Sequence, residues 1–265
     1  MTTEEIIKAH YADYDEDARL RSKHGMVEFV TTMRYVDKYL KSGDRVLEIG
    51  AATGRYSHAI ARKGYSVDAV ELSEHNIEIF KQNTADGENV RIRQGNAIDL
   101  SFIEDNSYDL TLLLGPMYHL FTVEEQRKAL IETLRVTKCG GKIFVAYCGN
   151  DATAVQFLFG KHMTKVDPYD KLVDTETFKL NSIPQEIICL HRKEDIDVLM
   201  SGLNAERLHF VGTDMLTQYM REAVDEMDEE EYALYLKYVQ VTCERQDLVG
   251  FSNHLLDISV KKDGV

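Results

Sequence analysis

Short apolar runs alternate with helical patterns through the first 150 residues of the chain. Buried strands are typically short and mostly apolar, and such runs occupy residues 45–49, 67–70, 108–114 and 142–148. Residues 90–94 are expected to form a further strand. Between these strands, apolar residues recur at the three- and four-residue spacing that is typical of an amphipathic helix. This alternation predicts a doubly wound α/β fold, in which helices cover both faces of a mostly parallel sheet.

Turn and capping residues punctuate these elements. Ser73 is expected to cap the helix that follows it, and Thr122 with Glu125 forms the pattern of a capping box. A turn at 139–141 is expected to lead into the fifth strand. The remaining pattern predicts helices at 26–40, 194–200, 215–225 and 228–245, and strands at 206–213 and 254–261.

We predict one domain, because no stretch rich in Gly, Ser or Pro marks a boundary within the 265 residues. Residues 43–148 form its core. The two late strands are joined by a long connection, so they are expected to pair antiparallel at the sheet edge. A helical lid, residues 1–42, and insertions at 150–190 and 215–250 are expected to form a cap over the carboxyl ends of the strands.

The stretch from Arg45 to Leu72 indicates the chemistry. A strand ends at a turn of small residues between Gly50 and Gly54, then a helix and a second strand follow, and that strand ends in Glu71. Glycine at such a turn admits a positive φ and lets a ligand approach the backbone. An acid about 20 residues after the turn lies within reach of the ribose hydroxyls of an adenosine ligand.

Composition narrows the range of partners. The formal charge of -14 disfavours nucleic acid, because an acidic surface repels a phosphate backbone. The acidic, polar start is unlike a signal peptide, and no apolar run approaches the roughly 20 residues of a membrane helix. The four cysteines and the scattered histidines lack metal-ligand spacing, so we expect reduced thiols, a cytoplasmic protein and no metal site.

Five motifs occur together in this part of the chain: EIGAATG, Glu71 at the end of the second strand, GNA at 95–97, DLTLLLGPMYHL and RVTKCGGKIFVAY. As a set they resemble the class I S-adenosylmethionine-dependent methyltransferases, and the resemblance covers about residues 43–148. It implies a seven-stranded Rossmann-like sheet and S-adenosylmethionine as cofactor. The GxGxxG pattern of NAD enzymes is absent, because Ala52 stands at the middle glycine position.

The resemblance also implies which residues hold the donor. Its methionine part is expected over a loop that contains Glu48, Gly50, Ala51 and Gly54, and its two ribose hydroxyls on Glu71. The remaining cofactor contacts are expected from Leu72 beside the adenine, Asn96 and Ala97 at its edge, Leu114 and Gly115 at the donor ammonium, and Tyr14 and Tyr56 closing over the cofactor.

Methyl transfer from a sulfonium needs alignment above all, and it needs a base only where the acceptor keeps its proton at neutral pH. His119 and Tyr118 follow the fourth strand, where an acceptor is expected. His119 is the candidate base, because its ordinary pKa of about 6.5 suits proton removal near neutrality. The alternative is a histidine that binds backbone and steadies the loop.

We therefore predict a methyltransferase for a small-molecule acceptor. The alternatives are an NAD-type oxidoreductase, a non-catalytic protein of this fold, and methylation of a protein side chain. The acceptor, the attacking atom and the oligomeric state are not specified by the sequence.

Overall fold

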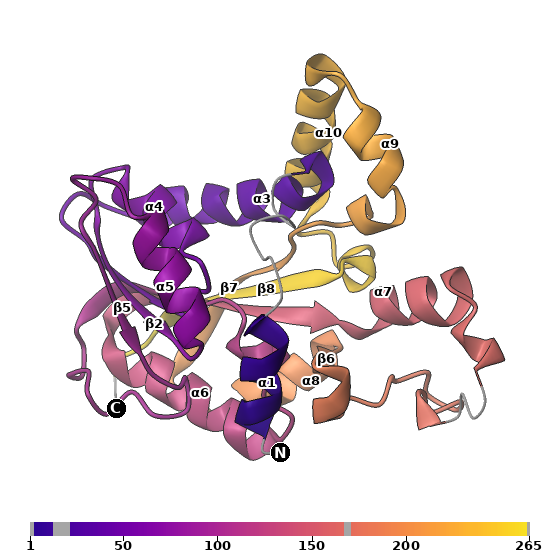
Figure 1. The fold of residues 1–265 in the computed structure, drawn as a ribbon, viewed down its shortest axis with the longest axis horizontal. Coiled ribbons are helices and arrows are strands. Elements are labelled where there is room, and N and C mark those ends of the chain that lie inside the picture. Colours follow the sequence, from indigo (N-terminus) through magenta and orange to yellow (C-terminus); the bar gives the residue numbers. More distant parts are fainter. Residues whose placement is uncertain (1–2, 13–21, 167–170, 264–265) are drawn as a thin grey trace.

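The computed structural model describes residues 3–12, 22–166 and 171–263 and shows a twisted sheet between two layers of helices (Figure 1). The sheet has eight strands, in the order β3-β2-β1-β4-β5-β8-β7, with the short β6 beside β5. The strands are β1 Arg45–Ile49, β2 Ser66–Glu71, β3 Val90–Gln94, β4 Tyr108–Leu113, β5 Thr137–Gly149, β6 Leu190–His191, β7 Ala205–Gly212 and β8 His254–Lys261.

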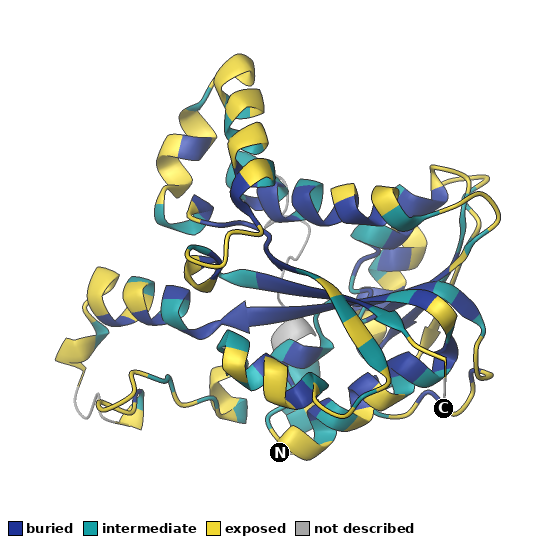
Figure 2. Ribbon diagram, turned by 180° about the vertical axis from the view of Figure 1, so that it is seen from behind, coloured by how far each residue is buried: buried dark blue, intermediate teal, exposed yellow. Residues whose placement is uncertain are grey.

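The helices divide between the two faces. Side chains of α3, α4 and α10 pack with Val46, Leu110 and Phe144 on one face, and those of α6 and α8 pack with Leu47 and Leu113 on the other. Both faces of the central strands are therefore buried (Figure 2). The helices are α1 Thr3–Ala12, α3 Lys23–Tyr39, α4 Arg55–Ala61, α5 Glu74–Asn83, α6 Val123–Val136, α7 Asn150–Ala154, α8 Lys193–Met200, α9 Arg221–Glu226 and α10 Glu229–Thr242.

The predicted doubly wound fold is confirmed, including the antiparallel pairing of β8 with both β5 and β7. The capping box at Thr122 and the Ser73 cap are also present. The strand count of seven was one too few, because β6 pairs two residues with the end of β5. The turn expected at 139–141 is instead an irregularity inside β5, with Gly140 at a φ of +75° where the register with β4 shifts.

Two arms extend beyond the carboxyl end of β5 (Figure 1). One continues from α7 through a π-helical turn, Val155–Gly160, and the other is formed by α9 and α10. The helix expected at 215–225 begins only at Arg221, after a 3-10 turn at Thr217–Tyr219. No helix in the described part of the chain is both long and apolar enough to cross a membrane.

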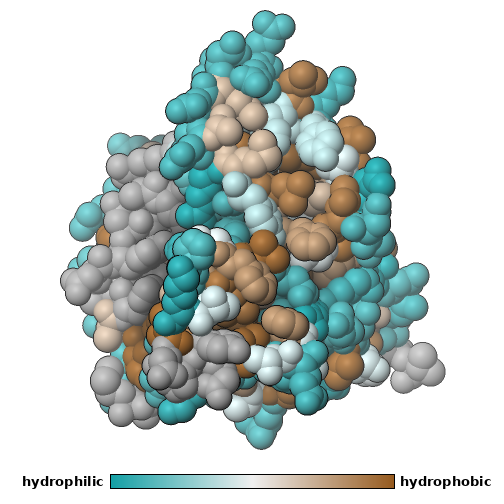
Figure 3. Space-filling view, turned by 90° about the vertical axis from the view of Figure 1, so that its right-hand side faces the viewer, coloured by the Kyte–Doolittle hydropathy of each residue, from teal (hydrophilic) through white to brown (hydrophobic). Residues whose placement is uncertain are grey.

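The first arm has a small core of its own, formed by Ala154, Leu158 and Val173. Phe157 and Phe159 of this arm are exposed and lie outside that core. Apolar side chains gather on the face of the molecule at which the two arms end (Figure 3).

The hairpin of β7 and β8 is held by a buried ion pair. Arg207 Nη2 lies 2.6 Å from Oδ2 of Asp257, whose side chain is fully buried, and Asp197 takes a second bond from the guanidinium. Removing one partner of a buried pair leaves the other charge without compensation.

Arg207→Met should therefore destabilise the protein by about 3 kcal/mol, measured as the free energy of unfolding in urea. In an Asp257→Asn background the same substitution should cost much less, because no buried charge is left. An equal cost in both backgrounds would show that the pair does not hold the hairpin.

Candidate functional site

The loop after β1 needs glycine at two positions. Gly50 has a φ of +78°, and a Cβ there would lie 2.5 Å from Cδ of Pro116 in the loop after β4. Gly54 has a φ of +93°, and a Cβ there would lie 2.5 Å from Nε2 of His58. The sequence predicted glycines for close approach of a ligand; the structure shows that they also let the two loops and α4 pack together.

Glu71 is buried where β2 ends, and its carboxylate faces the glycine loop. Oε2 accepts a hydrogen bond from the Ala52 N–H at 2.8 Å, and Oε1 accepts one from the Ser73 N–H at 2.9 Å. Burial raises the pKa of Glu71, an effect that these N–H donors and the Asn76 amide partly offset. The carboxylate is thus fixed in orientation before any ligand binds.

Glu48 is a second buried carboxyl, 2% exposed, on β1. Its Oε2 accepts a hydrogen bond from the Ser57 hydroxyl on α4. Burial raises its pKa to about 8, and the nearby charge of Glu71 adds to the rise. At neutral pH Glu48 is therefore mostly a neutral acid that can donate a hydrogen bond.

Two cavities lie at the carboxyl edge of the sheet, and Gly50 and Gly115 line both of them. The first has a volume of about 370 Å³ and the second about 540 Å³. Each lies where ligands bind in open α/β sheets.

The predicted residues divide between these cavities. Of those beyond the two shared glycines, the first cavity is lined by Glu71, Leu72, Asn96, Ala97 and His119. The second is lined by Glu48, Ala51, Tyr56, Leu114 and Tyr118. Gly54 lines neither cavity and precedes the first residue of α4, while Tyr14 lies outside the described residues.

Asn96 and His119 each hold backbone groups. Oδ1 of Asn96 accepts the Ile98 N–H at 3.2 Å, which fixes the loop after β3. Nδ1 of His119 lies 2.9 Å from the Ile187 carbonyl oxygen. Because a carbonyl only accepts, Nδ1 carries the proton and Nε2 carries the lone pair of the neutral ring. The backbone contact that was the alternative to a base is therefore present.

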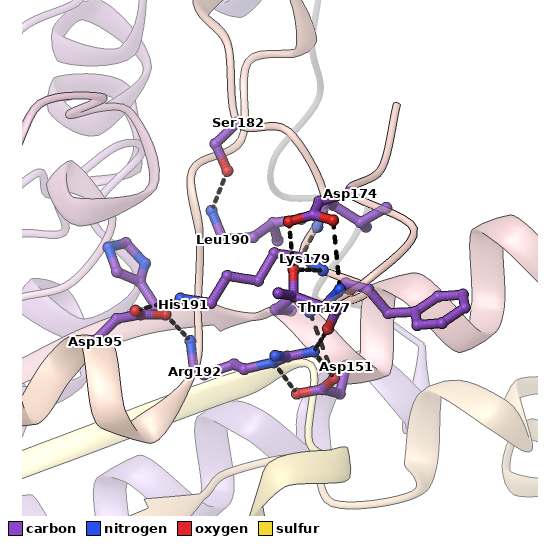
Figure 4. Close-up of polar contacts among 12 residues, drawn as sticks. Asp151, Asp174, Thr177, Lys179, Ser182, Leu190, His191, Arg192 and Asp195 are labelled. Carbon is purple, nitrogen blue, oxygen red and sulfur yellow. Dashed lines mark hydrogen bonds and ion pairs between the residues drawn. The ribbon is translucent and has the colours of Figure 1, made fainter. Parts of the chain in front are cut away.

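The loop that His119 contacts is anchored by charged side chains (Figure 4). Arg192 donates to both carboxylate oxygens of Asp151 at 2.8 and 2.9 Å, and Lys179 lies 2.6 Å from Asp195. The Cys189 N–H donates to the Tyr118 carbonyl at 2.6 Å. These contacts fix the segment between residues 179 and 192 to α7, α8 and the loop after β4. Residues 186–188 of this segment are thereby held at the second cavity.

Several residues at these cavities escaped the sequence analysis. Thr3, Glu4 and Ile7 of α1 line the first cavity. Glu28, Arg55 and His254 line the second. No local pattern marks them, since they come from separate elements that only the fold brings together.

The raised pKa of Glu48 predicts a particular pH dependence of stability. A carboxyl whose folded-state pKa is raised holds its proton more tightly when folded, so stability is lost as pH rises from the ordinary glutamate pKa towards about 8. In Glu48→Gln this loss should disappear, because the amide oxygen can still accept from Ser57. Between pH 5 and 8 the difference should be roughly 1 kcal/mol per pH unit, measured by urea unfolding.

Glu78→Gln, on an exposed part of α5, is the matched control and should keep the wild-type pH dependence. Identical slopes for Glu48→Gln and wild type would mean that Glu48 is already ionised in the folded protein.

Comparison with known proteins agrees with this geometry. Residues 46–141 match the family described as a methyltransferase domain. Over 104 residues the chain is 36% identical to a demethylmenaquinone methyltransferase of Clavibacter sepedonicus. The aligned residues make up 39% of this chain and 41% of that protein. The chain thus spans about two fifths of the length of the curated relatives that it matches.

Two solved structures share the fold at low identity. A SAM-dependent methyltransferase from Methanosarcina mazei is 18% identical, with a TM-score of 0.56 over 87% of this chain and 98% of its own. A phosphoethanolamine N-methyltransferase from Haemonchus contortus, solved with phosphoethanolamine and S-adenosylhomocysteine, is 15% identical, with a TM-score of 0.61 over 100% of this chain and 51% of its own. Residues 46–141 thus form a methyltransferase domain, and the rest of the chain shares its fold with these solved structures.

Proposed function

We propose that this protein transfers a methyl group from S-adenosylmethionine to a small-molecule acceptor. The observation that carries the proposal is the buried Glu71 carboxylate, held beside a glycine loop at the edge of the first cavity. A fixed carboxylate at the end of the second strand suits the two hydroxyls of a ribose.

The donor then extends across both cavities. Its adenosine occupies the first, with the ribose on Glu71 and the adenine near Leu72, Asn96 and Ala97. Its methionine part passes the shared glycines into the second, beside Glu48 and Ala51. Gly50 and Gly115 line both cavities, so the two cavities adjoin there and one elongated ligand is proposed to occupy both.

The second cavity also leaves room for the acceptor. The sulfur is a neutral leaving group, so the protein has to align nucleophile, methyl carbon and sulfur and to exclude competing water. The walls that face the acceptor come largely from outside residues 46–141, namely from α3, the 186–188 loop, the α9 region and β8. The acceptor named for the curated relatives, demethylmenaquinone, is therefore not carried over to this chain.

Calorimetric titration separates this function from that of an NAD-type enzyme. We expect S-adenosylhomocysteine to bind and NADH not to bind. In Glu71→Ala the dissociation constant for S-adenosylhomocysteine should rise about 100-fold, because hydrogen bonds to a charged acceptor contribute roughly 1.5–3 kcal/mol each.

The exposed control Glu78→Ala should bind like the wild type. Unchanged affinity in Glu71→Ala would refute the placement of the ribose, and tight binding of NADH would refute the choice of donor.

His119→Ala tests where this histidine acts. The base hypothesis predicts slower turnover with unchanged donor affinity, but His119 lines the same cavity as Glu71 and Asn96. We therefore expect the dissociation constant for S-adenosylhomocysteine to rise roughly tenfold, as one lost contact of about 1.4 kcal/mol would produce. His75→Ala, exposed on α5, is the control. Slower methyl transfer with unchanged affinity would instead support the role of base.

A further inference from the structure

A buried aspartate and a histidine meet at the wall of the second cavity. Asp214 follows β7 and His254 begins β8, and Nδ1 of His254 lies 2.8 Å from Oδ2 of Asp214. The antiparallel register of the hairpin, with Gly212 opposite Leu255, brings these residues together although they are separated by 40 positions. The His254 ring lines the cavity, whereas the Asp214 side chain is fully buried behind it.

The Asp214 carboxylate accepts two further hydrogen bonds. Its Oδ1 accepts from the Ser252 hydroxyl at 2.5 Å and from the His254 N–H at 3.1 Å. Ser252 Oγ in turn accepts the Met215 N–H at 2.9 Å. Burial acts to raise the pKa of Asp214, but the charge and hydrogen bonds of His254 and the Ser252 hydroxyl hold it below its usual value. A buried, ionised and immobile carboxylate fixes the orientation and the tautomer of the imidazole that it binds.

Other groups surround the ring. Glu28 of α3 places Oε2 at 3.4 Å from the same Nδ1, and the Tyr118 ring lies 6.2 Å away between centroids. Cys148 pairs with His254 across the β5–β8 ladder. The other titratable or charged residues that line this cavity are His24, Glu48, Arg55, Tyr56, Glu186 and Arg221. Two carboxylates at Nδ1 favour a proton on that nitrogen, so Nε2 carries the lone pair of the neutral ring.

We propose that His254, oriented by Asp214, is the general base that removes the acceptor's proton during methyl transfer. The acceptor is accordingly a nucleophile that keeps its proton at neutral pH, either a hydroxyl or an ammonium. This inference rests on the proposed function, since it assigns the acceptor's half of the same site.

The step balances without a further reagent. The acceptor atom forms a bond to the methyl carbon, the bond from carbon to sulfur breaks, and its electron pair stays on sulfur as neutral S-adenosylhomocysteine. The acceptor proton moves to Nε2 of His254, and the imidazolium is stabilised by Asp214 and Glu28 until it releases the proton to water.

A second histidine of the same hairpin also binds an acid, but this pair lies away from the two cavities. His209 on β7 also binds a carboxylate through Nδ1, at 2.9 Å from Glu244. It lines neither of the two cavities at the sheet edge, and the side chain of its partner is 47% exposed. His209→Gln is therefore a matched control for a histidine with an acid partner.

The test uses tritiated S-adenosylmethionine and the small-molecule fraction of a cell extract as acceptor source. His254→Gln should lower the initial rate of label transfer at pH 7 about 100-fold, within the range for loss of a general base. The deficit should shrink at alkaline pH, where more of the acceptor loses its proton unaided. Affinity for S-adenosylhomocysteine should stay within twofold of wild type, and His209→Gln should transfer label at the wild-type rate.

A wild-type rate in His254→Gln, or a deficit that is constant with pH, would overturn the assignment. Wild-type protein that binds S-adenosylhomocysteine but labels nothing would overturn it as well. Failure to bind S-adenosylhomocysteine at all would refute the proposed function instead.

A second measurement needs no acceptor. In ¹⁵N-labelled protein, long-range proton–nitrogen NMR should show His254 protonated at Nδ1, and Asp214→Asn should shift that tautomer. A ring protonated only at Nε2 in the wild type would refute the role of base. If Asp214→Asn does not fold, the wild-type spectrum and His254→Gln still decide the question.

Discussion

The close approach of the loops after β1 and β4 sets the geometry of the whole site. Gly50 lies against Pro116 with no room for a Cβ, and its N–H donates to the Val70 carbonyl at 2.8 Å. Three neighbouring parallel strands, β2, β1 and β4, are thereby tied together at their carboxyl ends. A larger residue at position 50 would separate these loops and open the boundary that the two cavities share.

Two buried carboxyls lie on either side of that boundary, and their environments give them different chemistry. Glu71 is surrounded by N–H donors and suits an acceptor of hydroxyl protons. Glu48 has one hydroxyl donor and a pKa of about 8, so it is a neutral donor under most conditions. Two ionised carboxylates this close would repel each other in a buried setting, and protonation of Glu48 relieves that repulsion. In the proposed binding mode, one acid would therefore bind the ribose while the other would lie beside the sulfonium without a full negative charge.

Local sequence was sufficient to predict the structure wherever contacts between neighbours along the chain determine it. The predicted strands at 90–94 and 254–261 have the observed bounds, and the caps at Ser73 and Thr122 follow from side chains three residues from their partners. Local sequence was insufficient where contacts between distant segments determine the structure. Whether Gly140 makes a turn or an irregular strand depends on pairing with β4, and the existence of β6 depends on a two-residue contact with β5. The Asp214–His254 contact joins residues 40 positions apart, and each looks unremarkable in its own segment.

The same division applies to function. The residues proposed to hold the donor lie between 48 and 119, and nearly all of them fall in motifs that the sequence displays. The proposed acceptor side is formed by Glu28, the 186–188 loop, Arg221 and His254, which belong to four separate segments outside residues 46–141. A similarity confined to the donor half therefore carries information about the methyl source and none about its destination. The proposed choice of acceptor therefore depends on α3, the two arms and the final hairpin. In these segments the evidence for function comes from side-chain chemistry and not from a sequence motif.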